Sequence, residues 1–298
     1  MRQAAGTGQW AGNFRGSRRG HGTDFDDLRP YSAGDELRHV DWKASARSNA
    51  LYTRLYREER EHRVTLLTDL RSSMFTGTHA LRSAKACQLS ARLLWQATES
   101  GSRLCVIGIL DAGLAVSDNR AGHNAAIDAC ALLARHFEAQ ARSSDTPCEK
   151  LISLDPEGKH GSEADLTLEQ VARWLSAQRQ LHGSVIWLSA FDQLGKYFDQ
   201  AMNMLSQATR QAAIHIDDDM LEQGLPAGHY GYRSGPLHHR SHQAVTLGRR
   251  QLRQLQQHLN LQKQQRSARF SSLLVPLLNS GSGKMDIVAT LRQSGHLP

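Results

Sequence analysis

The sequence predicts an α/β protein built on a doubly wound, mostly parallel sheet. Short stretches that are apolar throughout alternate with longer stretches whose apolar residues recur at helical spacing. Strands that are apolar on both faces are typical of parallel sheets covered by helices on each side. With 298 residues and 40% hydrophobic side chains, the chain is long enough to bury such a core.

The expected elements follow one another in that alternating order. Strands are expected at 62–69, 103–113, 184–191 and 212–219, and helices at 80–100, 124–141, 168–183 and 196–211. A polar helix with a narrow leucine stripe is expected at 251–265. We therefore expect one α/β domain over residues 61–270, with any functional site at the carboxyl ends of its strands.

The two ends of the chain differ from the central region in composition and lack its regular alternation of strands and helices. Residues 1–22 are rich in Gly, Arg and Ser, and the first part of them, residues 1–15, is expected to be flexible. In residues 16–60 acids and bases interleave around single apolar anchors, without sustained periodicity, which predicts an irregular charged strap packing on the main domain. Residues 271–298 are expected to form a loose tail with one helical turn near Ile287.

Charge and hydropathy narrow the class of partner. The 36 basic and 29 acidic residues give a net charge of +7, which indicates a surface of both signs with only weak attraction to anionic partners. No apolar run reaches the roughly 18 residues of a membrane span, and the N-terminus lacks the apolar core of a signal peptide. We expect a cytoplasmic protein without membrane insertion and without a nucleic-acid partner.

A candidate site lies where the first strand of the domain passes into a helix. Asp69 ends the strand, and Ser72 and Ser73 follow. A loop of the pattern Asp-x-Ser-x-Ser can bind a hard cation through its oxygens. Here Arg71 stands at the first serine position, and a guanidinium about 4 Å from a divalent cation would be repelled by a few kcal/mol. Arg71 is therefore expected to neutralise Asp69 in place of an ion.

No metal or other cofactor is expected on this basis. Were Mg²⁺ bound, its ligands would be Asp69, Ser73 and Thr167. The sequence also lacks a Ser–His–Asp nucleophile elbow, a zinc ligand set and a dinucleotide fingerprint, so no catalytic residues are assigned.

Two alternatives stay open at this point. A metal-dependent hydrolase could use the acids of residues 24–41, with His21 and His39, as a metal or acid–base cluster. Against this, bases nearly match the acids, which favours salt bridges; the acids are Asp24, Asp26, Asp27, Asp35 and Asp41, and the bases are Arg29, Arg38, Lys43 and Arg47. A weak nucleic-acid binder is the second alternative, because "FRGSRRGHG" is typical of arginine–glycine segments that touch RNA loosely.

The segment "GSRRGHGTDFDDLRPYSAGDELRHVDWKASAR" resembles the signature of the bacterial family called domain of unknown function 58. The family pattern is G-x-G-x-E/D-F followed by L-R-x-Y-x-x-G-D-x-x-R-x-I/V-D-W-K-x-S-A-R. The matching residues are Gly20, Gly22, Asp24, Phe25, Leu28, Arg29, Tyr31, Gly34, Asp35, Arg38, Val40, Asp41, Trp42, Lys43, Ser45, Ala46 and Arg47.

The resemblance implies a fold similar to the von Willebrand factor A domain, whose metal-ion-dependent adhesion site carries Asp-x-Ser-x-Ser. It also implies a non-enzymatic adaptor that works with a MoxR-type AAA+ ATPase in assembling or activating a client protein. This chain departs from the pattern at Arg71 and at Ala190, where relatives usually carry aspartate. The metal site is thus expected to be degenerate.

The partner-binding face is expected at this degenerate loop. Its residues are Asp69, Arg71, Ser72, Ser73 and Asp192, the last of which would point the same way as Ala190 if the strand continued. The signature segment is either a second contact surface or a structural brace.

Overall fold

The computed structural model describes residues 19–20, 24–48, 50–57, 62–77, 80–142, 166–178, 181–192, 194–218, 226–234, 241–280 and 286–298. The stretch expected to be flexible, residues 1–15, lies outside this described part of the chain.

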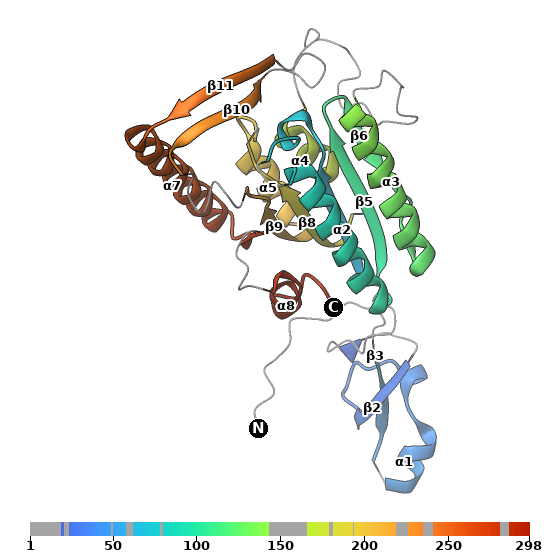
Figure 1. Cartoon of the computed structure of the whole chain (residues 1–298). Coiled ribbons are helices and arrows are strands. Elements are labelled where there is room, and N and C mark those ends of the chain that lie inside the picture. The colour runs from blue at the N-terminus through green and yellow to red at the C-terminus, as the bar shows by residue number, and fades with distance from the viewer. Residues whose placement is uncertain are drawn as a thin grey trace.

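A central, mostly parallel sheet organises the molecule (Figure 1). Its strands lie in the order β12-β9-β8-β4-β5-β6. Every neighbouring pair is parallel except β5 with β6, and the short β7 also pairs antiparallel with β5. The strands are β4 (Arg63–Asp69), β5 (Arg103–Leu110), β6 (Gly113–Val116), β7 (Arg120–Ala121), β8 (Gly183–Ser189), β9 (Thr209–His215) and β12 (Leu277–Asn279).

This order places a switch point between two central strands. The first strand, β4, lies between β5 and β8, so the chain builds one half of the sheet outward from β4 and then returns to build the other half. In sheets of this kind, ligands bind where the strand order reverses, at the carboxyl ends of the strands. The ends of β4 and β8 therefore mark the expected position of a site.

Helices cover both faces of the sheet. Successive strand residues point to opposite faces, and the strands carry apolar residues on both, so each face needs a cover. Leu66 and Ile186 belong to a core beneath α2 (Arg82–Glu99), α3 (His123–Arg142) and α8 (Ile287–Gln293). Their neighbours Leu67 and Trp187 belong to a second core, formed with α4 (Leu168–Ser176), α5 (Phe198–Ser206) and the end of α7 (Arg249–Ser272). This alternation is the period-two pleat of a strand buried on both faces, and it confirms the doubly wound α/β prediction.

The C-terminal segment corrects the expected boundary at residue 270. The prediction of a loose tail over 271–298 was wrong, because β12 pairs with β9 at the sheet edge and α8 closes one core. Leu278, Ile287, Leu291 and Leu297 are at least nine-tenths buried there. The helical turn expected near Ile287 is the start of α8, but a strand of three residues and a helix of seven are too short for periodicity to predict their place in the core.

The N-terminal segment also differs from its prediction. Instead of an irregular strap, it forms a small antiparallel sheet of β1 (Arg19–Gly20), β3 (Tyr52–Arg57) and β2 (Asp24–Pro30), with the turn η1 (Leu37–His39) and the helix α1 (Trp42–Ser48). We call residues 24–57 the signature module. Charged side chains along its strands obscured the alternation that normally indicates a strand. Its packing on the α/β domain stays a prediction.

A hairpin and a long helix complete the structure. Strands β10 (Gly228–Ser234) and β11 (Ser241–Leu247) pair with each other, and α7 follows them (Figure 1).

Among the described residues, no helix combines the length and apolar character that a bilayer crossing needs.

Candidate functional site

The candidate site is centred on Asp69, which ends β4 at the switch point. Its carboxylate is completely buried. Ser189, the last residue of the neighbouring strand β8, donates its hydroxyl to Asp69 Oδ2 at 2.6 Å. The short helix η2 (Ser72–Met74) begins three residues after Asp69. Two adjacent strand ends thus fix the carboxylate, as the topology predicts.

Arg71 closes on this carboxylate with a two-pronged contact. Its Nε donates to Asp69 Oδ1 at 2.9 Å, its Nη2 donates to Oδ2 at 2.6 Å, and its backbone N–H donates to Oδ1 at 3.1 Å. A further nitrogen, Nη1, donates to the carbonyl oxygen of Leu166 at 2.8 Å. Such paired hydrogen bonds between ions are among the strongest in proteins. The predicted neutralisation of Asp69 by Arg71 is present in the structure.

The ion pair is fully enclosed. The side chains of Arg71 and Asp69 are each only 1% exposed. Burial lowers the pKa of Arg71, but the hydrogen bonds and charge of Asp69 raise it by more, so the pKa lies above its ordinary value and the guanidinium remains cationic. Both oxygens of Asp69 are consequently occupied by donors from Arg71 and Ser189.

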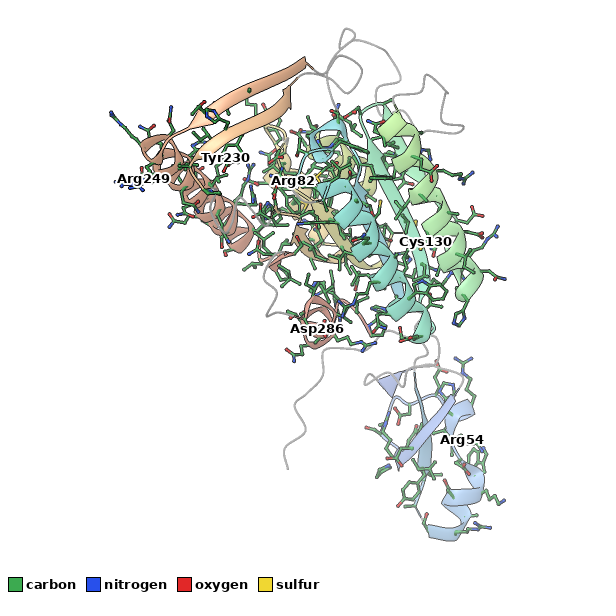
Figure 2. The ribbon with its side chains drawn as sticks, in the orientation of Figure 1. Arg54, Arg82, Cys130, Tyr230, Arg249 and Asp286 are labelled. Carbon is green, nitrogen blue, oxygen red and sulfur yellow. The ribbon has the colours of Figure 1, made fainter. Side chains whose placement is uncertain are left out.

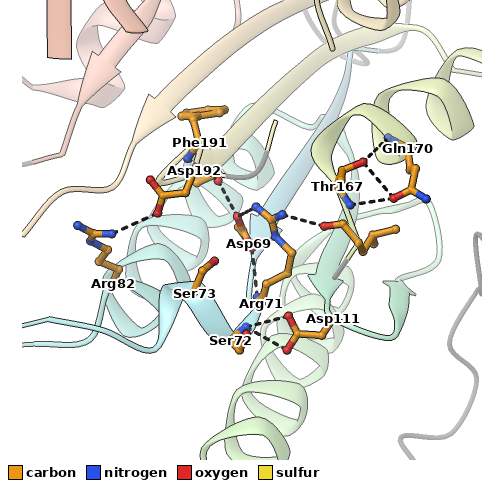
Figure 3. Close-up of polar contacts among 12 residues, drawn as sticks. Asp69, Arg71, Ser72, Ser73, Arg82, Asp111, Thr167, Gln170, Phe191 and Asp192 are labelled. Carbon is orange, nitrogen blue, oxygen red and sulfur yellow. Dashed lines mark hydrogen bonds and ion pairs between the residues drawn. The ribbon is translucent and has the colours of Figure 1, made fainter. Parts of the chain in front are cut away.

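The two serines lie on the rim of this pair and are partly exposed. The backbone N–H of Ser72 donates to both carboxylate oxygens of Asp111, each at 3.0 Å, and Gln140 Nε2 donates to Asp111 Oδ2 at 2.6 Å. Ser73 lies between Asp69 and Arg82 in the close-up view (Figure 3). Asp111 therefore fixes the start of η2 and leaves the serine side chains at the surface of the loop.

Thr167 has a structural task of its own. It is the N-cap of α4, where its hydroxyl accepts from Gln170 N at 3.4 Å and donates to Gln170 Oε1 at 3.0 Å. The backbone N–H of Thr167 also donates to Gln170 Oε1 at 2.9 Å, which completes a capping box. Asp69 and Thr167, two of the three residues considered as Mg²⁺ ligands, thus direct their oxygens to other partners. Within the described part of the chain, no three His, Cys, Asp or Glu side chains gather as a metal site would require.

Asp192 reaches the rim through a turn rather than along a strand. Strand β8 ends at Ser189, and Phe191 adopts a left-handed backbone with φ of 55°, so the period-two argument from Ala190 does not apply. The Asp192 side chain is 45% exposed and approaches Arg82 Nη1 at 3.5 Å. Desolvation by its surroundings raises the pKa of Asp192, although the charge of Arg82 opposes this.

Sequence reasoning missed several members of the site. Ser189 carried a usable signal, because it is the one hydroxyl at the carboxyl end of an otherwise apolar strand in "SVIWLSAF". Asp111, Arg82 and the carbonyl of Leu166 carried none. Their roles depend on how separate strand ends and helices meet in the fold.

Two aspartates of the signature module, Asp35 and Asp41, form hydrogen bonds within the module. Asp35 accepts from Arg29 Nη2 at 2.6 Å and from Ser32 N at 2.9 Å, beside Gly34 at φ of 110°. Asp41 accepts from Ala44 N at 2.9 Å, which caps α1, and from Arg54 Nε at 2.9 Å. These hydrogen bonds hold the pKa of Asp35 and of Asp41 below their usual range. Both carboxylates brace the module.

The other signature residues are spread over the same small sheet and helix. Arg38 pairs with Glu36, while Trp42 is 63% exposed and Leu37 is 62% exposed. Gly20 lies in β1, Asp24, Phe25 and Arg29 lie in β2, Tyr31 follows β2, and Lys43 and Arg47 lie in α1. Gly22 and His21 fall outside the described residues, as do the side chains of Asp24, Phe25 and Asp26. Of the expected partners, Arg29 pairs with Asp35, whereas Asp41 pairs with Arg54.

The chain was compared with known protein families and with curated proteins. The model of a family described as "Protein of unknown function DUF58" matches residues 27–266. A comparison with curated proteins found no match.

Solved structures with similar features have low identity. They include the conserved hypothetical protein BatB from Bacteroides thetaiotaomicron, at 10% identity with 78% of this chain and 95% of that chain covered and a TM-score of 0.43. An aerotolerance-related membrane protein from Bacteroides fragilis follows at 11% identity, 78% and 96% coverage and a TM-score of 0.39. Manganese-loaded TRAP protein from Plasmodium vivax has 17% identity, 52% and 57% coverage and a TM-score of 0.33. At these TM-scores the likenesses carry no argument by themselves.

Proposed function

We propose, from the premise that this chain belongs to the DUF58 family, that it is a non-enzymatic protein-interaction protein whose partner docks on the rim around Asp69. We call this region the switch-point face; it consists of the buried pair Asp69 and Arg71 and of a rim formed by Ser72, Ser73 and Asp192. Following the family resemblance, the partner is a MoxR-type AAA+ ATPase acting on a client protein in the cytoplasm.

The observation that carries this proposal is the enclosed pair of Asp69 and Arg71. A cation held by Asp69 would need at least one free carboxylate oxygen, and here the guanidinium and the Ser189 hydroxyl engage both. The guanidinium lies where a divalent ion would meet the carboxylate, and it supplies a permanent positive charge that needs no loading. We infer that the loop keeps the shape of a metal-dependent adhesion site and has replaced its ion, so partner binding is independent of Mg²⁺.

The rim, rather than the pair, supplies the contact groups. Arg71 is 1% exposed and cannot reach a partner, whereas Ser72 and Ser73 are partly exposed and the Asp192 side chain is 45% exposed. Polar groups around a rigid centre favour specificity and orientation in an interface. Asp69 and Arg71 then position the loop, while the two serines and Asp192 meet the partner.

The signature module offers a second contact surface. Its aspartates are used internally, but Trp42 and Leu37 expose most of their apolar side chains. Exposed aromatic side chains are over-represented at protein interfaces, where they bury large areas at low entropic cost. We infer that the module is a brace through Asp35 and Asp41 and a contact through Trp42.

The proposal is tested by pull-down with the tagged full-length chain from its native extract, in Mg²⁺ and again in EDTA. Recovery of a MoxR-type ATPase in equal amounts under both conditions is expected. Asp192→Arg, which reverses a charge on the switch-point face, is expected to reduce that recovery at least tenfold. The matched control is Asp118→Arg, at a carboxylate 73% exposed and remote from this face, which should leave recovery unchanged.

Three results would contradict the proposal. Failure to recover any AAA+ ATPase would refute the adaptor function. Loss of nucleotide-free ATPase in EDTA would refute the replacement of the ion by Arg71, and equal losses with Asp192→Arg and Asp118→Arg would remove the switch-point face from the interface.

A further inference from the structure

A second polar feature lies beside the switch-point face, in a cavity of about 90 Å³. Its walls are the start of α2, a residue that follows β8, the end of β9 with a residue that follows it, and one side of α7. Arg82, labelled in Figure 2, is the first residue of α2 and lines this cavity as well as the rim. Pockets for drug-sized ligands measure roughly 300–1,000 Å³, so this cavity suits only a small chemical group.

Three cationic side chains converge on the cavity: Arg82 from α2, and Lys263 and Arg266 from α7. Two carboxylates, Asp192 and Asp217, also line it, so cations outnumber anions by three to two. Asp192 meets Arg82 only at 3.5 Å, the limit of a hydrogen bond. The cavity therefore retains an excess of positive charge in a partly desolvated place, where electrostatic attraction is strengthened.

Two buried nitrogens in the cavity wall lack a well-aligned acceptor. Arg82 Nε and His215 Nδ1 are both buried without a hydrogen-bond partner. His215 is 3% exposed, and its Nε2 accepts from Arg266, so the proton of the neutral ring lies on Nδ1. The carboxylate of Asp217 remains 3.7 Å from that nitrogen. Unsatisfied buried donors are unfavourable, and a group composed only of acceptors would satisfy them.

The pKa of His215 shows that the three cationic side chains act on the same point in the cavity. Burial, followed by the charges of Arg266, Arg82 and Lys263 in that order, lowers the pKa of His215 to about 3, against a smaller opposing effect of the Asn279 side chain. Burial and the charge of Arg82 also lower the pKa of Arg266, against the opposing effect of Asp192 and Asp217. An anion between these groups would relieve the repulsion of Arg82 and Arg266.

We propose that this cavity is a binding site for one small oxyanion group, a carboxylate or a phosphate, held by Arg82, Arg266 and His215 Nδ1. The cations supply the attraction, the two unsatisfied donors supply direction, and the size of the cavity limits the ligand to a single anionic group. This site goes beyond the partner assignment, because it concerns the chain alone.

The test is a titration of the full-length ¹⁵N-labelled chain with inorganic phosphate and, separately, with acetate, at constant ionic strength maintained with chloride. We expect saturable chemical-shift changes at the amides of residues 215–217 and at Arg82 Nε–H with at least one of the two anions. Saturation by acetate alone identifies a carboxylate site, and saturation by phosphate alone identifies a phosphate site.

Variants locate the binding. Arg82→Gln and Arg266→Gln are each expected to weaken it at least tenfold, while Arg253→Gln, on the exposed side of α7, should leave it unchanged. Thermal unfolding of each variant verifies the fold, and Arg82→Gln decides the outcome if Arg266→Gln does not fold. Linear, non-saturable shifts with both anions, or equal weakening by Arg253→Gln, would overturn the proposal. The ATPase is absent from this test, so its result is independent of the proposed partner.

Discussion

At the scale of single residues, the molecule depends on one buried ion pair. Removing two charges from water is costly, and the pair of Arg71 and Asp69 offsets this cost through two-pronged hydrogen bonds supported by Ser189 and the Leu166 carbonyl. The net contribution of the intact pair is therefore modest. The loss of one partner is severe, because it leaves the other charge buried and uncompensated.

Arg71→Met is accordingly expected to lower the free energy of unfolding by about 3–5 kcal/mol. The double variant Asp69→Asn with Arg71→Met should recover most of that loss, since no buried charge remains. Urea unfolding of the three proteins measures both changes. Equal stability of wild type and Arg71→Met would contradict a buried, ion-paired Arg71.

The residues of the site differ in how far sequence could predict them. The contact of Arg71 with Asp69 was predictable, because the two are close in sequence at a strand end and carry opposite charges. The positions of Thr167 and Asp192 were not. One depends on the helix that begins at residue 168, and the other on a left-handed turn at Phe191, which sequence patterns do not specify for a bulky residue.

At the scale of elements, the length of each segment decided whether its pattern was visible. Strands β4 and β8 are seven residues long and almost continuously buried, so their apolar runs predicted them well. Strand β12 and helix α8 are short, and a polar segment lies between them, so their contribution to the core appeared only in the fold. The signature module was obscured because charged residues interrupt the alternation of apolar side chains in its strands.

The integration of α8 into the core gives a direct prediction. Leu291 is completely buried in the core that covers one face of the sheet. Leu291→Ala is expected to lower the free energy of unfolding by about 2–5 kcal/mol, through lost burial and the cavity that remains.

The control is Gln293→Ala on the exposed side of the same helix, which should change the free energy by no more than about 0.5 kcal/mol. Urea unfolding measures both variants. A Leu291→Ala protein as stable as the Gln293→Ala protein would contradict the place of α8 in the core and support a loosely attached C-terminal tail.

At the scale of the whole molecule, buried histidines couple stability to pH. Burial, followed by nearby positive charges, lowers the pKa of His62 to about 4 and that of His215 to about 3. In the unfolded chain both would titrate near 6.5. Between these values the unfolded state binds more protons than the folded state, so stability is complete above about pH 6.5 and falls as the pH is lowered.

We expect the free energy of unfolding to decrease from pH 7 to pH 5, with each of these histidines contributing up to about 1.4 kcal/mol per pH unit. Urea titrations at several pH values measure the slope. His215→Gln should reduce it, whereas His182→Gln, at an exposed position, should not. A slope that both variants leave unchanged would assign the pH dependence to other groups.

The proposed function depends on Arg71 standing in place of a cation. The most direct test is isothermal titration of the chelator-stripped chain with Mg²⁺, with Ser73→Ala as the comparison, because Ser73 is the hydroxyl that would ligate an ion in this loop. We expect no Mg²⁺ binding that distinguishes the two proteins. Submillimolar binding of one Mg²⁺ by the wild-type chain, abolished by Ser73→Ala, would contradict it and show that the loop still holds a metal.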